Sequence, residues 1–273
     1  MTNIGFIGCG QMGQAILSGL LDQDVIERHK ILIASKDTTQ ATAKRFGVKA
    51  SSPQEILTTS DAVFLGIKPY QLHLVKPWIL DTQKERSALA SKTVLMSMLA
   101  GTNFTQLREV VDHHIDLVRI MPNLPAQVRQ GVTLICADPS QPNAQINQKL
   151  CTKLLEPLGL VEPLSHERQF HAATAISGCG PAYLFNLIEA LADAGVHEGL
   201  SRDMALRLSA HTVMGSGALA LLDHPAILKD RVTSPGGVTI AGVRSLERAG
   251  FRSTLMEAVI EATVRSKDME RSR

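Results

Sequence analysis

Short apolar runs alternate with segments of helical period through roughly the first 160 residues of the chain. Strands are predicted at Asn3 to Gly8 and Lys30 to Ala34, and helices at Gln11 to Leu21 and Thr38 to Phe46. Further strands are predicted at residues 62–67, 93–98, 115–121 and 132–136, separated by stretches long enough for crossover helices. Because these runs are continuous rather than alternating, they are typical of strands covered on both faces. The pattern predicts an α/β fold with a mostly parallel sheet.

The pattern changes near Leu160 to Pro163, and beyond Ser165 we predict only helices. We therefore place two domains at residues 1–163 and 164–273, as the length of 273 residues also favours. The segment Pro181 to Val196 is apolar nearly all round a helix, so every face must be buried. A domain of this size hardly buries such a helix alone, and we expect packing between subunits. Ser201 is the predicted N-cap of the next helix.

Composition excludes several classes of function. The formal net charge is only +2 with scattered basic residues, so no nucleic-acid partner is expected. The four cysteines form no CxxC pair, and no export signal or membrane-spanning run is seen, which predicts reduced thiols and a cytoplasmic location. The nine histidines show no metal-ligand spacing; His113 and His114 are expected to point oppositely in a strand. No metal site is predicted.

A glycine motif follows the first predicted strand and opens the first helix. Gly8, Gly10 and Gly13 fit the pattern G-x-G-x-x-G. Glycines there permit a tight turn and close backbone approach, and the helix N-terminus receives a pyrophosphate. This context predicts a Rossmann-type dinucleotide site, with a tight turn without ligand as the alternative. Cys9 is interpreted as a packed thiol, since no neighbour lowers its pKa.

The ends of the next strands bear on the choice of cofactor. Ser35 and Lys36 stand where NAD sites usually have an acidic residue. A hydroxyl and an ammonium suit a 2′-phosphate, which favours NADPH, although Asp37 leaves use of NADH open and Lys36 alternatively is an ordinary surface lysine. Lys68 and Pro69 close another strand, where we expect a backbone contact with the ligand and leave the role of the Lys68 charge undecided.

The helical half carries a second candidate site. Ser234-Pro235-Gly236-Gly237 precedes a helical run that begins near Val238 and Thr239. The stretch predicts an N-cap, a proline at the first helical position and free backbone N–H groups. It outlines an anion pocket, with a tight helix entry without ligand as the alternative.

At this point the sequence resembles the pyrroline-5-carboxylate reductases, nearly from end to end. The stretch from Leu228 to Gly242 is the specific one, whereas the glycine motif is shared with other Rossmann reductases. The other motifs that carry the resemblance are Gly5 to Gly13, Lys68-Pro69, Ser97 to Gly101, Arg119 to Ala126, Ser177 to Tyr183 and Glu189 to Gly195.

The resemblance implies reduction of 1-pyrroline-5-carboxylate to L-proline by NADPH, or less often NADH. It also implies a helical domain that interlocks two subunits, often within larger rings such as a decamer. The substrate is expected at Ser234, Gly236, Gly237, Val238 and Thr239, with the Thr239 hydroxyl near the ring nitrogen as the catalytic group. The cofactor is expected at Gly8, Cys9, Gly10, Gln11, Met12, Gly13, Ser35, Lys36, Ile67, Lys68, Pro69, Met121, Pro122 and Asn123.

Three positions depart from the family pattern. Cys179 stands where many members have a serine, and Pro53 where many have an asparagine near the adenine. The loop from Leu221 to Pro225 is shorter than in some members and lacks a glutamate, which leaves Asp223 as an uncertain substitute. Two alternative functions stay open: a β-hydroxyacid dehydrogenase, which shares the glycine motif, and a non-catalytic NADPH-binding regulator.

Overall fold

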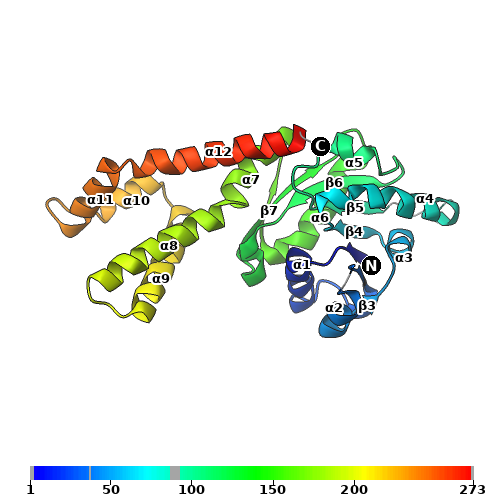
Figure 1. Ribbon diagram of the computed structural model, residues 1–273, viewed down its shortest axis with the longest axis horizontal. Coiled ribbons are helices and arrows are strands. Elements are labelled where there is room, and N and C mark those ends of the chain that lie inside the picture. Colours follow the sequence, from blue (N-terminus) through cyan, green and yellow to red (C-terminus); the bar gives the residue numbers. More distant parts are fainter. Residues whose placement is uncertain (1–2, 37, 87–92, 272–273) are drawn as a thin grey trace. The chain divides into compact units, whose positions relative to one another are not determined.

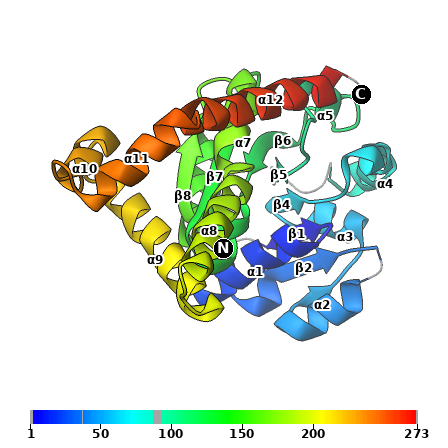
Figure 2. The same ribbon diagram turned by 60° about the vertical axis from the view of Figure 1, so that its left-hand side comes forward.

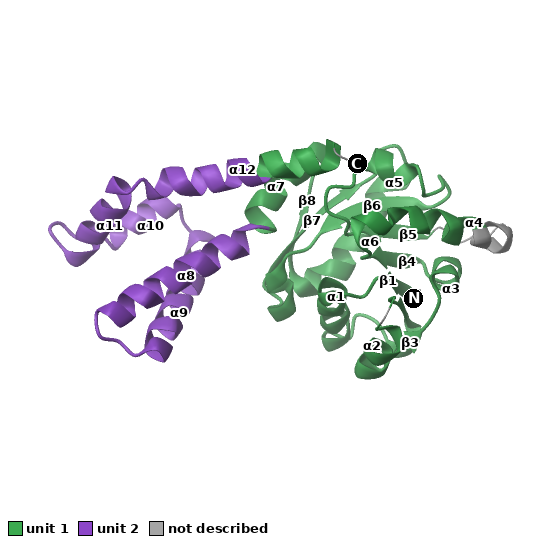
Figure 3. Cartoon of the chain, in the orientation of Figure 1, with its two compact units in different colours: residues 1–178, 263–273 green, residues 179–262 purple. Residues whose placement is uncertain are grey.

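The computed structural model describes residues 3–36, 38–86 and 93–271. By their contacts these residues form two compact units, one of residues 1–178 and 263–273 and one of residues 179–262 (Figure 3). The predicted boundary after residue 163 stays a prediction. Within the described residues, every helix is too short or too polar to span a bilayer.

The first unit is an α/β fold, as predicted (Figure 1). Its described residues form one eight-stranded sheet in the order β3-β2-β1-β4-β5-β6-β7-β8. Neighbouring strands are parallel except β6 and β7, which are antiparallel. The strands are β1 (Ile4–Ile7), β2 (Ile31–Ala34), β3 (Lys49–Ala50), β4 (Ala62–Leu65), β5 (Val94–Ser97), β6 (Asp116–Met121), β7 (Gly131–Ala137) and β8 (Gly159–Pro163).

Helices connect these strands on both faces of the sheet. They are α1 (Gln11–Asp22), α2 (Thr39–Phe46), α3 (Pro53–Thr59), α4 (Val75–Arg86), α5 (Phe104–Arg108) and α6 (Ala144–Leu155). Helix α7 (Phe170–Ser177) follows the last strand, β8. A 3₁₀ segment, η2 (Pro69–Leu74), leads from β4 into α4. His113 and His114 lie in a turn before β6, so their placement in a strand was wrong. The Asp112 carboxylate accepts a hydrogen bond from the His114 N–H, which stabilises the turn in place of a strand.

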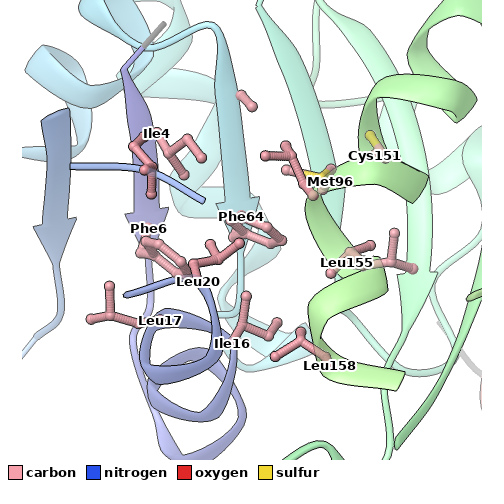
Figure 4. Close-up of a cluster of buried hydrophobic side chains, with 14 of the residues drawn as sticks. Ile4, Phe6, Ile16, Leu17, Leu20, Phe64, Met96, Cys151, Leu155 and Leu158 are labelled. Carbon is pink, nitrogen blue, oxygen red and sulfur yellow. The ribbon is translucent and has the colours of Figure 1, made fainter. Parts of the chain in front are cut away.

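Alternate residues of the central strands supply two hydrophobic clusters. Phe6, Phe64 and Met96 face the cluster that α1 and α6 cover (Figure 4). Phe6 lies opposite Phe64 in the register of β1 and β4, and their rings stack with centroids 4.7 Å apart. Val63 and Leu95 face the other cluster, which α3, α4 and α5 cover. Because both faces are buried, β1, β2 and β4 contain no polar side chain.

The second unit is helical. It contains α8 (Gly180–His197), α9 (Arg202–Ala220), α10 (Pro225–Arg231), α11 (Val238–Arg248) and most of α12 (Phe251–Arg271). Helices α8 and α9 lie side by side (Figure 2). The predicted cap at Ser201 is confirmed, because its hydroxyl accepts a hydrogen bond from the Met204 N–H.

Apolar side chains of α8 remain exposed in the single chain. Leu184 and Leu191 are about half exposed, and Phe185 is 53% exposed. Such a density of exposed large apolar residues marks an interaction surface. The second unit therefore exposes an apolar helix surface of the kind that we expected, from the apolar character of residues 181–196, to pack between subunits.

Candidate functional site

The loop after β1 is shaped by glycines that have no room for a side chain. Gly8 has φ +86°, and a Cβ added to it would lie 2.6 Å from the backbone of Gly66 and Ile67. Its N–H donates to the Ala34 carbonyl, and the Gly66 N–H donates to the Ile7 carbonyl. The ends of β1, β2 and β4 are thus drawn together at one edge of the sheet, where ligands of such folds bind.

The two other motif glycines differ in their surroundings. A Cβ on Gly13 would lie 3.3 Å from the Gly8 carbonyl oxygen, so Gly13 lets α1 pack closely on the loop. Gly10 is the N-cap of α1, and a Cβ there would meet no atom within 4 Å. No intramolecular contact requires glycine at position 10, and the space beside it is available to a pyrophosphate at the helix N-terminus.

A cavity of about 460 Å³ lies at this edge of the sheet. We call it the cofactor cavity. Six predicted cofactor residues line it: Gly8, Gly10, Ser35, Lys36, Ile67 and Lys68. The sequence did not point to most of its other lining residues, because they lie outside any motif. These are Ile7, Ala34, Thr39, Ser51, Pro53, Gly66, Gln71, Leu74 and Trp78.

Thr39 fixes the loop that carries the predicted 2′-phosphate residues. Its hydroxyl accepts a hydrogen bond from the Ser35 N–H at 2.6 Å and donates one to the Ser35 carbonyl. The Ser35 hydroxyl lies 3.1 Å from that of Thr38. Lys36 is exposed at the cavity rim, and Asp37 falls outside the described residues.

Lys68 leaves β4 in an extended conformation, as expected before a proline. Its N–H donates to the Gln71 side chain, and both residues line the cofactor cavity. The Lys68 side chain is exposed.

The remaining predicted cofactor residues do not line the cavity. Cys9 is fully buried, and burial raises the pKa of its thiol to about 12, in keeping with a packed thiol. Gln11 lines a separate cavity of about 250 Å³ beside Gln14 and Arg45. The other such residues are Met12, Gly13, Pro69, Met121, Pro122 and Asn123.

Asn123 is buried and its side chain is engaged within the protein. Its amide donates to the Ser177 carbonyl at 2.8 Å and accepts from the Val132 N–H at 2.8 Å. The side chain thus ties the end of β6 to the start of β7 and to the last turn of α7. Both ends of the side-chain amide therefore have a partner within the first unit.

The predicted substrate residues all lie in the second unit. Gly237 donates its N–H to the Ser234 carbonyl at 3.1 Å, and Gly236 has φ +66°. Residues 234–237 therefore form a β-turn with glycine at its left-handed third position. The predicted proline at the first helical position was wrong: α11 begins at Val238, and Gly237 is its N-cap. Val238 is 93% exposed and Thr239 is also exposed.

The structure also shows the surroundings of two positions that depart from the family pattern. Cys179 is the N-cap of α8 and is partly exposed. Asp223 forms an ion pair with Arg231 at 2.7 Å. Within the described residues, no three His, Cys, Asp or Glu side chains gather in a way that could hold a metal ion.

Comparison with known proteins gives consistent matches. A model of the pyrroline-5-carboxylate reductase dimerisation domain matches residues 167–269, and a model of NADP oxidoreductases that are coenzyme F420-dependent matches residues 3–100. The pyrroline-5-carboxylate reductase of Pisum sativum is 38% identical, over 97% of this chain and 95% of the relative. That of Escherichia coli K12 is 36% identical, over 98% of each chain.

Solved structures agree with these relatives. A Plasmodium falciparum pyrroline carboxylate reductase with NADP bound matches with a TM-score of 0.82 at 32% identity, covering 98% of each chain. A pyrroline-5-carboxylate reductase from Coxiella burnetii matches with a TM-score of 0.86 at 30% identity, again over 98% of each chain. The resemblance inferred from the motifs is confirmed, and the chain belongs to the pyrroline-5-carboxylate reductase family.

Proposed function

We propose that this chain reduces 1-pyrroline-5-carboxylate to L-proline with NADPH, NADH being the secondary donor. The observation that carries the proposal is near full-length identity of 36–38% to relatives with this activity in their names, combined with a cofactor cavity at the glycine motif. A β-hydroxyacid dehydrogenase and a non-catalytic regulator are not favoured. The relatives that match this chain over both its dinucleotide unit and its helical unit are named as pyrroline-5-carboxylate reductases.

The cofactor cavity fits a dinucleotide. The free space beside Gly10 lets a pyrophosphate approach the first backbone N–H groups of α1. Ser35 and Lys36 line the cavity and are the proposed 2′-phosphate ligands, and Thr39 hydrogen-bonds to the Ser35 backbone. When bound, NADPH supplies the hydride that the substrate accepts.

The turn at Ser234 to Gly237 is the proposed substrate site. The Gly237 N–H is bonded to the Ser234 carbonyl, so the Val238 N–H at the start of α11 is the backbone donor that suits the substrate carboxylate. The Thr239 hydroxyl is assigned to the ring nitrogen. A cyclic imine is basic enough to be partly protonated near neutrality, so positioning rather than a strong protein acid carries the reaction.

Finer features of the assembly and its location are part of the proposal. The exposed apolar side chains of the second unit support a homo-oligomer built on the dimerisation domain, and a larger ring such as a decamer is proposed. Unpaired cysteines support a cytoplasmic location. No nucleic-acid partner is proposed, given the net charge of +2.

The decisive experiment measures NADPH consumption by the purified protein with and without 1-pyrroline-5-carboxylate, followed by detection of proline. We expect consumption that depends on the imine and yields proline. Thr239→Val should lower kcat at least about tenfold, whereas Thr239→Ser, which keeps the hydroxyl, should retain most of it. NADPH binding without turnover of the imine would support the regulator instead, and unchanged kinetics in Thr239→Val would remove the hydroxyl from its role.

A further inference from the structure

The side chain of Gln14, in the first turn of α1, has no part in the function proposed above. Its Nε2 donates a hydrogen bond to the Cys9 carbonyl at 3.2 Å, and its Oε1 accepts one from the Arg45 guanidinium at 3.1 Å. A carbonyl oxygen only accepts and a guanidinium only donates, so these partners fix which end of the amide faces the glycine loop. The loop is thereby joined through α1 to Arg45 on α2.

Two successive carbonyls of the loop are held by the same residue. The ordinary helical bond runs from the Gln14 N–H to the Gly10 carbonyl at 2.8 Å. Cys9 lies before the helix, and its carbonyl is held instead by the Gln14 side chain. Both peptide bonds are trans, and in a planar trans peptide the N–H points away from the C=O. The N–H groups of Gly10 and Gln11 therefore point away from the contacts that Gln14 makes.

These two N–H groups stand where an anion would approach α1. The first N–H groups of a helix have no partner within it and carry a positive partial charge. A Cβ on Gly10 would meet no atom within 4 Å, so the space beside this residue is free of protein atoms. Donors that are already oriented bind an anion more tightly, because the loop does not have to be ordered on binding.

We propose that Gln14 is a positioning residue for the cofactor, which sets the Cys9–Gly10 peptide so that its N–H faces the pyrophosphate. The inference rests on the proposed function, which supplies the dinucleotide. Arg45 holds the Gln14 amide in place, and its own guanidinium is ordered by the Phe46 ring, whose centroid lies 5.1 Å from Cζ. Gln14 acts only through the peptide that it holds.

Two adenosine phosphates isolate the effect on the glycine loop. Adenosine 2′,5′-bisphosphate and adenosine 2′-monophosphate differ only in the 5′-phosphate, which is the group that the loop would receive. Gln14→Met removes the amide and keeps the length of the side chain. In calorimetry it should weaken binding of NADPH, NADH and the bisphosphate about fivefold, within the range for loss of one hydrogen bond. Binding of the monophosphate should not change.

Gln127 provides the matched control. It lines the same cavity of about 250 Å³ as Gln14 and Arg45, from the 3₁₀ segment η3 (Leu124–Val128). Gln127→Met should leave all of these affinities unchanged. Arg45→Met should weaken NADPH binding about threefold in the wild-type background and have no further effect in Gln14→Met, because the two residues act in one chain of contacts.

Steady-state assays separate positioning from a general loss of structure. Gln14→Met should raise the KM values for NADPH and NADH by the same factor and leave kcat and the KM for the imine unchanged. Unchanged NADPH binding by Gln14→Met would overturn the proposal, as would an equal loss for the monophosphate. Melting temperatures establish that each variant is folded. If Gln14→Met does not fold, the exposed Arg45 decides the matter, and unchanged NADPH binding by Arg45→Met would overturn the proposal.

The outcome can be told apart from that of the proposed function, because binding needs no turnover. A protein that shows the effect of Gln14→Met and does not reduce the imine loses the proposed reaction and keeps this inference. A protein that forms proline while Gln14→Met binds NADPH as wild type does keeps the reaction and loses the inference. Failure of the wild type to bind either dinucleotide would overturn both.

Discussion

Lys36 is the residue with the clearest bearing on cofactor choice. It is exposed at the rim of the cofactor cavity, directly after Ser35. We expect its ammonium to attract the 2′-phosphate of NADPH. Lys36→Ala should raise the KM for NADPH about tenfold and that for NADH less than twofold. Lys76→Ala, an exposed lysine outside this cavity, is the control in steady-state assays with both cofactors. Equal rises for both cofactors would contradict the assignment.

Gly8 and Gly10 separate the needs of folding from those of binding. A Cβ on Gly8 would press on the backbone of Gly66 and Ile67 at a positive φ, so Gly8→Ala should lower the free energy of unfolding by at least about 2 kcal/mol. Gly10→Ala meets no atom of the protein and should cost less than about 1 kcal/mol, yet weaken NADPH binding. Denaturant titration and calorimetry measure the two effects. The reverse pattern would rule out a pyrophosphate beside Gly10.

At the scale of elements, Asp138 joins the end of β7 to α5. Its carboxylate accepts hydrogen bonds from Arg108, at 3.0 and 2.9 Å, and from Ser140. Burial raises the pKa of Asp138, but the hydrogen bonds from Ser140 and Arg108 outweigh it, and the net pKa lies below the ordinary value of 3.8. A depressed pKa means that the stabilisation is present above about pH 4 and is lost as the pH falls through the folded value.

Asp138→Asn tests this link. At about pH 7 the variant should lose about 3 kcal/mol in free energy of unfolding, because the buried charge of Arg108 keeps only the backbone carbonyls of Asp112 and Ile115 as partners and no carboxylate. The difference from wild type should shrink as the pH drops below about 4 and disappear only below the lowered pKa of the folded carboxyl, where the wild-type carboxyl is itself protonated. Denaturant titrations across this range measure it. Glu27→Gln, in an exposed ion pair with Lys30, should change little at any pH. A constant difference would assign the loss to packing instead.

The elements that could be predicted from the sequence are those marked by a run of apolar residues or by a fixed spacing of glycines. Strands β1, β2 and β4 contain no polar side chain because both faces of the sheet are covered, and the glycine motif has its own spacing. The two-residue strand β3 gives no such signal, and β8 is an edge strand with Leu160 59% exposed. The turn at Ser234 was mistaken for a helix start, because a proline after a serine suits both. Trp78 lines the cavity from α4, a helix that packs on α3. Such contacts between helices cannot be predicted from a local sequence pattern.

At the scale of the whole molecule, the two units divide the chemistry. The described residues that line the cofactor cavity all belong to the first unit, and the turn from Ser234 to Gly237 belongs to the second. The helices of the second unit expose large apolar side chains, which need a partner to cover them. Cofactor binding and assembly are therefore expected to respond to different substitutions.

Phe185 on α8 and Leu80 on α4 provide a matched pair for that expectation, since both are 53% exposed. Phe185→Asp places a charge on the dimerisation unit, where its burial would cost several kcal/mol, and should shift the oligomer to monomers. Leu80→Asp in the first unit should leave the mass unchanged. Light scattering over a concentration series measures both. Each variant should still bind adenosine 2′,5′-bisphosphate with wild-type affinity. A wild-type mass for Phe185→Asp, or dissociation of Leu80→Asp, would move the interface away from α8.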